Sequence, residues 1–161
     1  GSAGKIFSLT GWKVGFVCAA PPILRVLAKS HQFLTFTTPP NLQTAVAYGL
    51  GKADDYFLGM RSELARSRDR LTQGLSSIGF PVLPSQGTYF LNVDLKPLGL
   101  NETDEALCKR LVADYKVAAI PVSAFYEEEP VTSVVRFCFA KKYETIDGAL
   151  ERLSRAVRAT R

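Results

Sequence analysis

Hydrophobic residues recur at helical spacing in two long stretches, residues 54–77 and 143–159. In the first stretch the apolar positions are Phe57, Met60, Leu64, Leu71, Leu75 and Ile78. In the second they are Ile146, Leu150, Leu153 and Val157. Steps of three and four residues place such positions on one face, so both stretches are predicted to be amphipathic helices. Gly79 is well placed to end the first helix.

Shorter apolar runs predict further elements before the long helix. Residues 14–19 indicate a buried strand, because the run is short and rich in residues that favour strands. The pair Pro21 and Pro22 is expected to open a helix over residues 21–30, since proline suits a first helical turn. A second short helix is expected from residues 39–41, with Asn41 as a possible cap.

A different order of elements follows Gly79. Residues 89–93, 117–122 and 134–139 are predicted to be strands. Residues 102–115 are predicted to form a helix, with Asn101 or Thr103 near its start. The order indicates a small sheet covered by helices and an α/β fold class.

A helix over residues 54–77 would be more than about 30 Å long at the usual rise per residue. We expect a helix of this length to connect two packed units. The predicted division is a first sheet domain over residues 1–52, a connecting helix over residues 53–78, and a smaller α+β domain over residues 79–161.

Composition excludes several classes of protein. Hydrophobic residues make up 47% and charged residues 22%, which is typical of globular domains rather than disordered chains. No apolar run approaches the roughly 18 residues of a membrane helix. No signal-peptide pattern precedes Lys5. We therefore expect neither a membrane span nor secretion.

The net charge of +5 comes partly from two arginine-rich stretches, residues 61–70 and 152–161. Acidic residues interrupt both, namely Glu63, Asp69 and Glu151. Solvated helix faces explain such stretches better than nucleic-acid binding does. No binding to nucleic acid is expected.

The three cysteines, Cys18, Cys108 and Cys138, lie far apart and form no C-x-x-C motif. A disulfide framework or a zinc site is therefore not expected. Free thiols in a reducing cytoplasm fit best. His31 is the only histidine, so a structural role is expected for it rather than metal binding.

The candidate chemistry begins at Lys5, in a segment crowded with small residues. A lysine amine becomes nucleophilic when burial or a nearby cation lowers its pKa, and Lys13 could be such a cation. Ser2 could donate its hydroxyl to the same anion that Lys13 binds. By themselves these residues form only a basic, glycine-rich segment.

Residues 2–15 read S-x-G-K-x-F-S-x-T-G-W-K-x-G. This string resembles the cofactor-lysine segment of class I and II aminotransferases of fold type I, which use pyridoxal 5'-phosphate (PLP). It is most similar to the group of kynurenine aminotransferases, glutamine transaminase K and bacterial methionine-type enzymes. Residues 38–45, 86–91, 119–126 and 135–139 recur in the same order in that group, so the resemblance covers essentially the whole chain.

The resemblance implies a role for each matching residue. Lys5 would carry PLP and act in catalysis, and Ser2 and Lys13 would bind its phosphate. Arg136 would bind the substrate α-carboxylate. Phe36 would lie near the neighbouring subunit's site in a homodimer, and Tyr89, like Phe125, near the substrate entrance.

The residues around Arg136 indicate that its side chain needs a binding partner. Val134, Val135, Phe137, Cys138 and Phe139 are all apolar. An arginine inside such a run needs a counterpart, and its planar guanidinium can bind a carboxylate through two parallel hydrogen bonds.

The resemblance implies amino transfer between an L-amino acid and a 2-oxo acid. Elimination chemistry on cysteine conjugates, or a non-catalytic interaction module, stays open as an alternative. The family's other cofactor contacts precede the lysine, so the chain is expected to be the C-terminal portion of a fold type I enzyme. In that case residues 1–52 are the remnant of the large PLP-binding domain. Alone, the chain is expected to bind PLP weakly or not at all, and to be inactive. The amino acid that it uses stays undecided.

Overall fold

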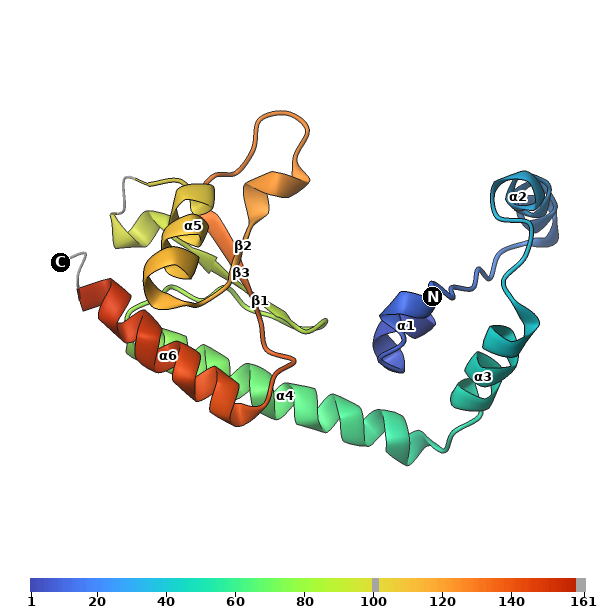
Figure 1. Cartoon of the computed structure of the whole chain (residues 1–161), viewed down its shortest axis with the longest axis horizontal. Helices are drawn as coiled ribbons and strands as arrows, with labels where there is room; N and C mark the ends of the chain where they lie inside the picture. Colours follow the sequence, from blue (N-terminus) through green and yellow to red (C-terminus); the bar gives the residue numbers. More distant parts are fainter. Residues whose placement is uncertain (100–101, 159–161) are drawn as a thin grey trace. The chain divides into compact units, whose positions relative to one another are not determined.

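The computed structural model describes residues 1–99 and 102–158, and Figure 1 shows its ribbon. Two compact units make up the chain, Gly1–Phe57 and Leu58–Arg161. We call them the N-terminal unit and the C-terminal unit. The division between them falls inside helix α4 (Asp54–Ser77). The division into residues 1–52, 53–78 and 79–161 stays a prediction.

The N-terminal unit is built from short helices. They are α1 (Ala3–Ile6), the 3₁₀ turn η1 (Thr10–Trp12), α2 (Pro21–Leu34), α3 (Pro40–Leu50) and the first turn of α4. Its buried core consists of Ala3, Val14 and Val46, with Phe7 and Leu42 packed against them. The Phe7 ring also lies 6.2 Å from the ring of Tyr56, centroid to centroid.

Three expectations for this unit are wrong. Residues 14–19 form no strand, because only Gly15 pairs with another residue, Ser2, in an isolated bridge. A strand needs a neighbour along its length, and Val17 instead stays 65% exposed. The helix opened by Pro21 ends at Leu34 rather than near residue 30. Asn41 is not a cap either, since α3 begins at Pro40 and Pro39 precedes it without a side-chain bond.

The C-terminal unit contains a three-stranded antiparallel sheet. Its elements after α4 are β1 (Phe90–Asp94), η2 (Lys96–Leu98), α5 (Asp104–Tyr115), β2 (Ile120–Pro121), η3 (Val122–Phe125), β3 (Val134–Cys138) and α6 (Tyr143–Arg158). The strand order is β1-β3-β2. Because β1 and β2 both run antiparallel to β3, they are parallel to each other, and α5 connects them across the sheet.

One face of this sheet is covered and the other is more open. Leu91 and Val93 of β1 and Val135 and Phe137 of β3 are buried. They join α4, α5 and α6 in one core whose helical members include Leu71, Leu75, Leu107, Leu111, Ile146 and Leu153. Side chains alternate along a strand, so Arg136 lies on the opposite, half-buried face.

The structure confirms most elements predicted for this unit. Helix α4 ends at Ser77, and Gly79 adopts a φ of +98°, which glycine accommodates without strain. Thr103 caps α5 by accepting the Ala106 N–H, whereas Asn101 lies outside the described residues, as does Ala159 at the predicted end of the last helix. Strand β2 is shorter than predicted at both ends: it begins at Ile120 rather than Val117, and the chain turns into η3 at Val122.

None of the described helices is both long enough and apolar enough to cross a membrane.

Candidate active site

The first sixteen residues form a loop that closes on itself. The Gly1 ammonium donates to the Phe16 carbonyl at 2.7 Å, and the Phe16 N–H donates to the Gly1 carbonyl at 2.9 Å. The Ala3 N–H donates to the Val14 carbonyl at 3.0 Å. This short ladder sets Ser2 opposite Gly15, close to Lys13 in the chain. The two ends of the predicted motif, residues 1–3 and 14–16, are therefore paired with each other.

Ser2 and Lys5 flank the first turn of α1. The Ser2 hydroxyl oxygen caps this helix by accepting the Gly4 N–H at 3.3 Å. Accepting a bond uses a lone pair, so the hydroxyl can still donate its hydrogen to an anion. Lys5 lies within α1 and is exposed.

Lys13 follows the 3₁₀ turn with a left-handed backbone, at φ 55° and ψ 39°. This conformation is uncommon for a residue with a side chain, and it turns the chain back toward the ladder with residues 1–3. Thr10 fixes the same turn, because its hydroxyl donates to the Gly4 carbonyl at 3.2 Å. One closed loop thus carries Ser2, Lys5 and Lys13.

Arg136 lies in the middle strand of the C-terminal unit, between two aromatic rings. Its guanidinium carbon is 5.1 Å from the Phe90 ring centroid and 4.7 Å from that of Phe125. Its Nε–H donates to Asn92 Oδ1 at 3.5 Å, across the β1–β3 register. These contacts hold the side chain by cation–π attraction and by one hydrogen bond.

No ion pair among the described residues includes Arg136. Its terminal nitrogens can therefore receive a carboxylate from a ligand without first breaking a salt bridge. A guanidinium beside aromatic rings, and half-buried, binds such a carboxylate more strongly than one in water.

Phe125 is supported by the buried carboxylate of Asp104. This residue is 0% exposed at the start of α5. Its two oxygens accept the Ser123 N–H at 2.8 Å and the Ser123 hydroxyl at 2.9 Å. Ser123 and Phe125 both belong to η3, so the carboxylate fixes the turn that carries the ring.

Cys108 lies one turn further along α5. Burial raises the pKa of its thiol to about 11, and the neighbouring Asp104 carboxylate acts in the same direction. The thiol is therefore protonated at neutral pH and is not a candidate nucleophile.

Two predicted site residues remain, Phe36 and Tyr89. Phe36 follows α2 with a φ of 67° and is 74% exposed. Tyr89 precedes β1 and packs against the covered side of the sheet, with its ring centroid 4.3 Å from that of Phe90. Their roles stay predictions.

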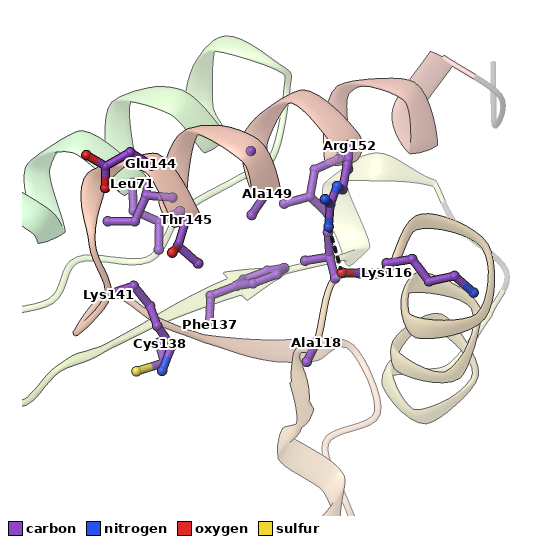
Figure 2. Close-up of a pocket in the computed structure, with 14 residues that line it drawn as sticks. Leu71, Lys116, Ala118, Phe137, Cys138, Lys141, Glu144, Thr145, Ala149 and Arg152 are labelled. Carbon is purple, nitrogen blue, oxygen red and sulfur yellow. Dashed lines mark hydrogen bonds between the residues drawn. The ribbon is translucent and has the colours of Figure 1, made fainter.

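A cavity of about 430 Å³ lies beneath α6, on the covered face of the sheet. Figure 2 shows Phe137 at its centre and Arg152 reaching the Lys116 carbonyl, which accepts a bond at 3.3 Å. Phe137 and Arg136 point to opposite faces of β3, so this cavity is separate from the arginine site. Every buried polar side-chain atom among the described residues has a hydrogen-bond partner.

Sequence reasoning missed Phe90, Asn92 and Asp104. The alternation of side chains along a strand places Phe90 and Asn92 on one face, but pairing them with Arg136 requires the strand register. Asp104 looked like an ordinary acidic residue in the first turn of a helix. Its contact with Ser123, nineteen positions later, has no local signal.

The comparisons with known proteins identify the family of this chain. The family model of aminotransferases of class I and II matches residues 1–153. The chain is 38% identical over 162 residues to the probable N-succinyldiaminopimelate aminotransferase DapC of Mycobacterium tuberculosis, covering 95% of this chain and 41% of that protein. It is also 38% identical over 152 residues to the methionine aminotransferase of Escherichia coli, covering 94% of this chain and 39% of that protein.

Solved structures of aminotransferases match the fold of this chain. The N-succinyldiaminopimelate aminotransferase of Mycobacterium tuberculosis matches with a TM-score of 0.88 at 40% identity, over 96% of this chain and 40% of that one. YbdL of Escherichia coli, described with a methionine aminotransferase function, matches with a TM-score of 0.86 at 37% identity, over 96% of this chain and 40% of that one.

The matched structures share the mixed α/β fold of this chain over nearly its whole length. The chain belongs to the family of class I and II aminotransferases, whose members are PLP-dependent. It spans about 40% of the length of the relatives it matches.

Proposed function

We propose that the protein carrying this chain transfers an amino group between an L-amino acid and a 2-oxo acid, with PLP attached to Lys5. The closed loop of residues 1–16 carries this proposal. It carries one amine, one hydroxyl and a second cation within one loop closed by a short ladder, and their order in the sequence matches the family's cofactor segment.

The residues of this loop suit the chemistry of the cofactor. PLP has a phosphate, which the Ser2 hydroxyl and the Lys13 ammonium would bind by charge-assisted hydrogen bonds. It also has an aldehyde, with which the Lys5 amine would react. When bound, the cofactor supplies an electron sink that stabilises negative charge at the substrate Cα.

The chain's own residues would then divide the work. Arg136 binds the α-carboxylate of the amino acid through two parallel hydrogen bonds and so orients the Cα–H bond. Phe90 and Phe125 hold the guanidinium in place for that pair through cation–π contacts. The Lys5 amine, once displaced, takes the proton from Cα and acts as general base.

A homodimer in the cytoplasm is the second part of the proposal. Helix α2 has no buried residue among those described, and apolar side chains on it and just after it are exposed, namely Ile23, Val26, Phe33, Leu34 and Phe36. A second copy would cover this surface and place Phe36 near the neighbour's site. The cysteines Cys18, Cys108 and Cys138 are all free, in line with a reducing compartment.

Trapping the cofactor tests the assignment of Lys5. Borohydride reduction of the purified protein, followed by peptide mass spectrometry, should find the cofactor on Lys5. Lys5→Ala should lose both the label and amino transfer, by at least about 100-fold, because it removes the general base. Lys29→Ala, on the exposed surface of α2, is the matched control and should keep both. A label on another lysine would refute the assignment.

The products separate amino transfer from elimination. Three amino donors should be tried first, because relatives are named for them: N-succinyl-diaminopimelate, methionine and kynurenine. A 2-oxo acid formed together with a new amino acid supports transfer. Pyruvate and ammonia from a cysteine conjugate, without transfer, would favour the elimination alternative instead. Sedimentation that shows a monomer at micromolar concentration would contradict the homodimer.

A further inference from the structure

The carboxylate of Asp104 is fully buried, yet no ion pair among the described residues includes it. Burying an anion without a cation is costly, so its hydrogen bonds must compensate. Oδ1 accepts the Glu105 N–H and the Ser123 hydroxyl, both at 2.9 Å, and Oδ2 accepts the Ser123 N–H at 2.8 Å. The start of α5 contributes too, since a helix N-terminus favours a negative charge.

These bonds connect the segments on both sides of the arginine site. Through Ser123 the carboxylate holds η3, which carries Phe125 two residues later. The Asp104 N–H also donates to the Thr132 carbonyl at 2.8 Å, two residues before β3 begins. A single residue thus fixes the ring that lies over Arg136 and the entry to the strand that carries Arg136.

The pattern of donors requires a carboxylate. All three groups that point at the Asp104 side chain are hydrogen-bond donors. An asparagine offers one acceptor oxygen and a donor NH₂ group, and in either orientation of the amide the NH₂ group would face a backbone donor, the Ser123 N–H or the Glu105 N–H. The isosteric change therefore weakens the hydrogen bonding that holds η3 without changing the volume of the side chain.

We infer that Asp104 is a positioning residue for the substrate-carboxylate site: through Ser123 it holds Phe125 against Arg136. This inference rests on the proposed role of Arg136 as the carboxylate-binding residue. Asp104 itself touches neither Arg136 nor the substrate.

The kinetic test uses Asp104→Asn in the protein that carries this chain. Loss of the fixed ring should weaken binding of the amino-acid carboxylate equally in the ground state and the transition state. KM for the amino donor should therefore rise about tenfold, with kcat within about twofold of the wild type. Ser123→Ala, which removes only the hydroxyl, should raise KM less, and Ser123→Thr should restore it.

A merely structural role predicts a different result. Leu107→Ala, in the same helix, removes a core side chain that is 2% exposed and should lower stability without moving KM. If Asp104→Asn lowers only the active fraction, with KM unchanged, the inference is overturned. It is also overturned if Leu107→Ala raises KM as much.

A second readout does not depend on activity. The Nε–Hε NMR signal of Arg136 should be shifted by the ring current of Phe125, and Phe125→Leu gives its position without that ring. Asp104→Asn should move the signal toward this position, whereas Asp147→Asn, at an exposed ion pair with Arg70, should not. An unmoved signal in Asp104→Asn overturns the inference. A moved signal in a protein without transfer activity supports the positioning and defeats only the proposed function.

Discussion

The two units of this chain differ in how much of their apolar surface they bury. Sixteen described residues form the buried core of the C-terminal unit around one sheet. Three described residues, Ala3, Val14 and Val46, form that of the N-terminal unit. The proposed cofactor lysine lies in the sparsely packed unit and the proposed substrate arginine in the densely packed one. Order around these two residues therefore has different physical origins.

Conformational entropy explains why the difference matters. Ordering the backbone costs about 1–2 kcal/mol per residue, and burying a large apolar side chain returns about 1.5–3 kcal/mol. The C-terminal unit buries many more apolar side chains than the N-terminal unit, so a larger part of this cost is offset there. In the N-terminal unit, α2 buries none of its described residues, and Phe33 and Leu34 remain 87% and 84% exposed. Covering that surface would add the stability that this unit lacks.

Amide hydrogen exchange should show the largest contrast. In the 161-residue chain, amides of β3 should exchange only through global unfolding, whereas those of α2 should exchange through local opening. The difference in opening free energy should be about 5 kcal/mol, within the range from frayed segments to whole domains. Exchange followed by mass spectrometry measures it. Equal protection of α2 and β3 would remove the distinction between the units.

Removing one core leucine should give the next largest effect. Leu75 is 0% exposed in α4, so Leu75→Ala should lower the free energy of unfolding by about 3 kcal/mol. Leu50 in α3 is 48% exposed, so Leu50→Ala, the matched change in the N-terminal unit, should cost less than about 0.5 kcal/mol. Urea titrations measure both. A large loss in Leu50→Ala would show that α3 packs more firmly than its exposure indicates.

The same contrast separates what the sequence could predict from what it could not. Helix α4 was predicted at its observed bounds, because its period, length and terminal Gly79 are all local signals. The strand expected over residues 14–19 was wrong, because strand formation depends on a partner that no local pattern reveals. Local sequence signals therefore predicted the elements of the C-terminal unit better than those of the N-terminal unit.

The candidate site follows the same rule. Ser2, Lys5 and Lys13 lie within one short motif, so their grouping in one loop could be expected. The apolar flanks of Arg136 indicated that it needs a partner, but not that Phe90, Asn92 and Phe125 surround it. That enclosure depends on strand register and on the turn held by Asp104, both of which are tertiary features.

The reactivity of the cysteines also distinguishes the two units, and the expected effect on stability between pH 8 and pH 10 is smaller. Cys18 is exposed in the N-terminal unit and should react with a thiol reagent within minutes at pH 8, whereas buried Cys108 should react only after unfolding. Burial raises the pKa of Cys108 to about 11. The folded state therefore keeps this proton above pH 9, where the unfolded chain loses it.

Stability attributable to the Cys108 thiol should thus be complete below about pH 9 and fall as the pH rises toward 11, by about 3 kcal/mol in all, of which about 1 kcal/mol is lost by pH 10. Urea midpoints at pH 8 and pH 10 measure the fall. Cys108→Ala should show a smaller drop between these two pH values than the wild type. An equal drop in both proteins would assign the alkaline loss to other groups.

Two glycines in α4 test how far the dense packing extends along this helix. Nothing lies within 4 Å of a Cβ built on Gly59, so Gly59→Ala should stabilise the protein by about 1 kcal/mol through helix propensity. A Cβ on Gly74 would overlap the Leu150 side chain of α6. Gly74→Ala gains the same propensity but overpacks the contact between the two helices, so it should destabilise by about 1 kcal/mol net. Thermal unfolding of both variants measures the opposite signs. If Gly74→Ala also stabilises, Leu150 adopts another rotamer at little cost, and the α4–α6 contact is looser than the rest of this core.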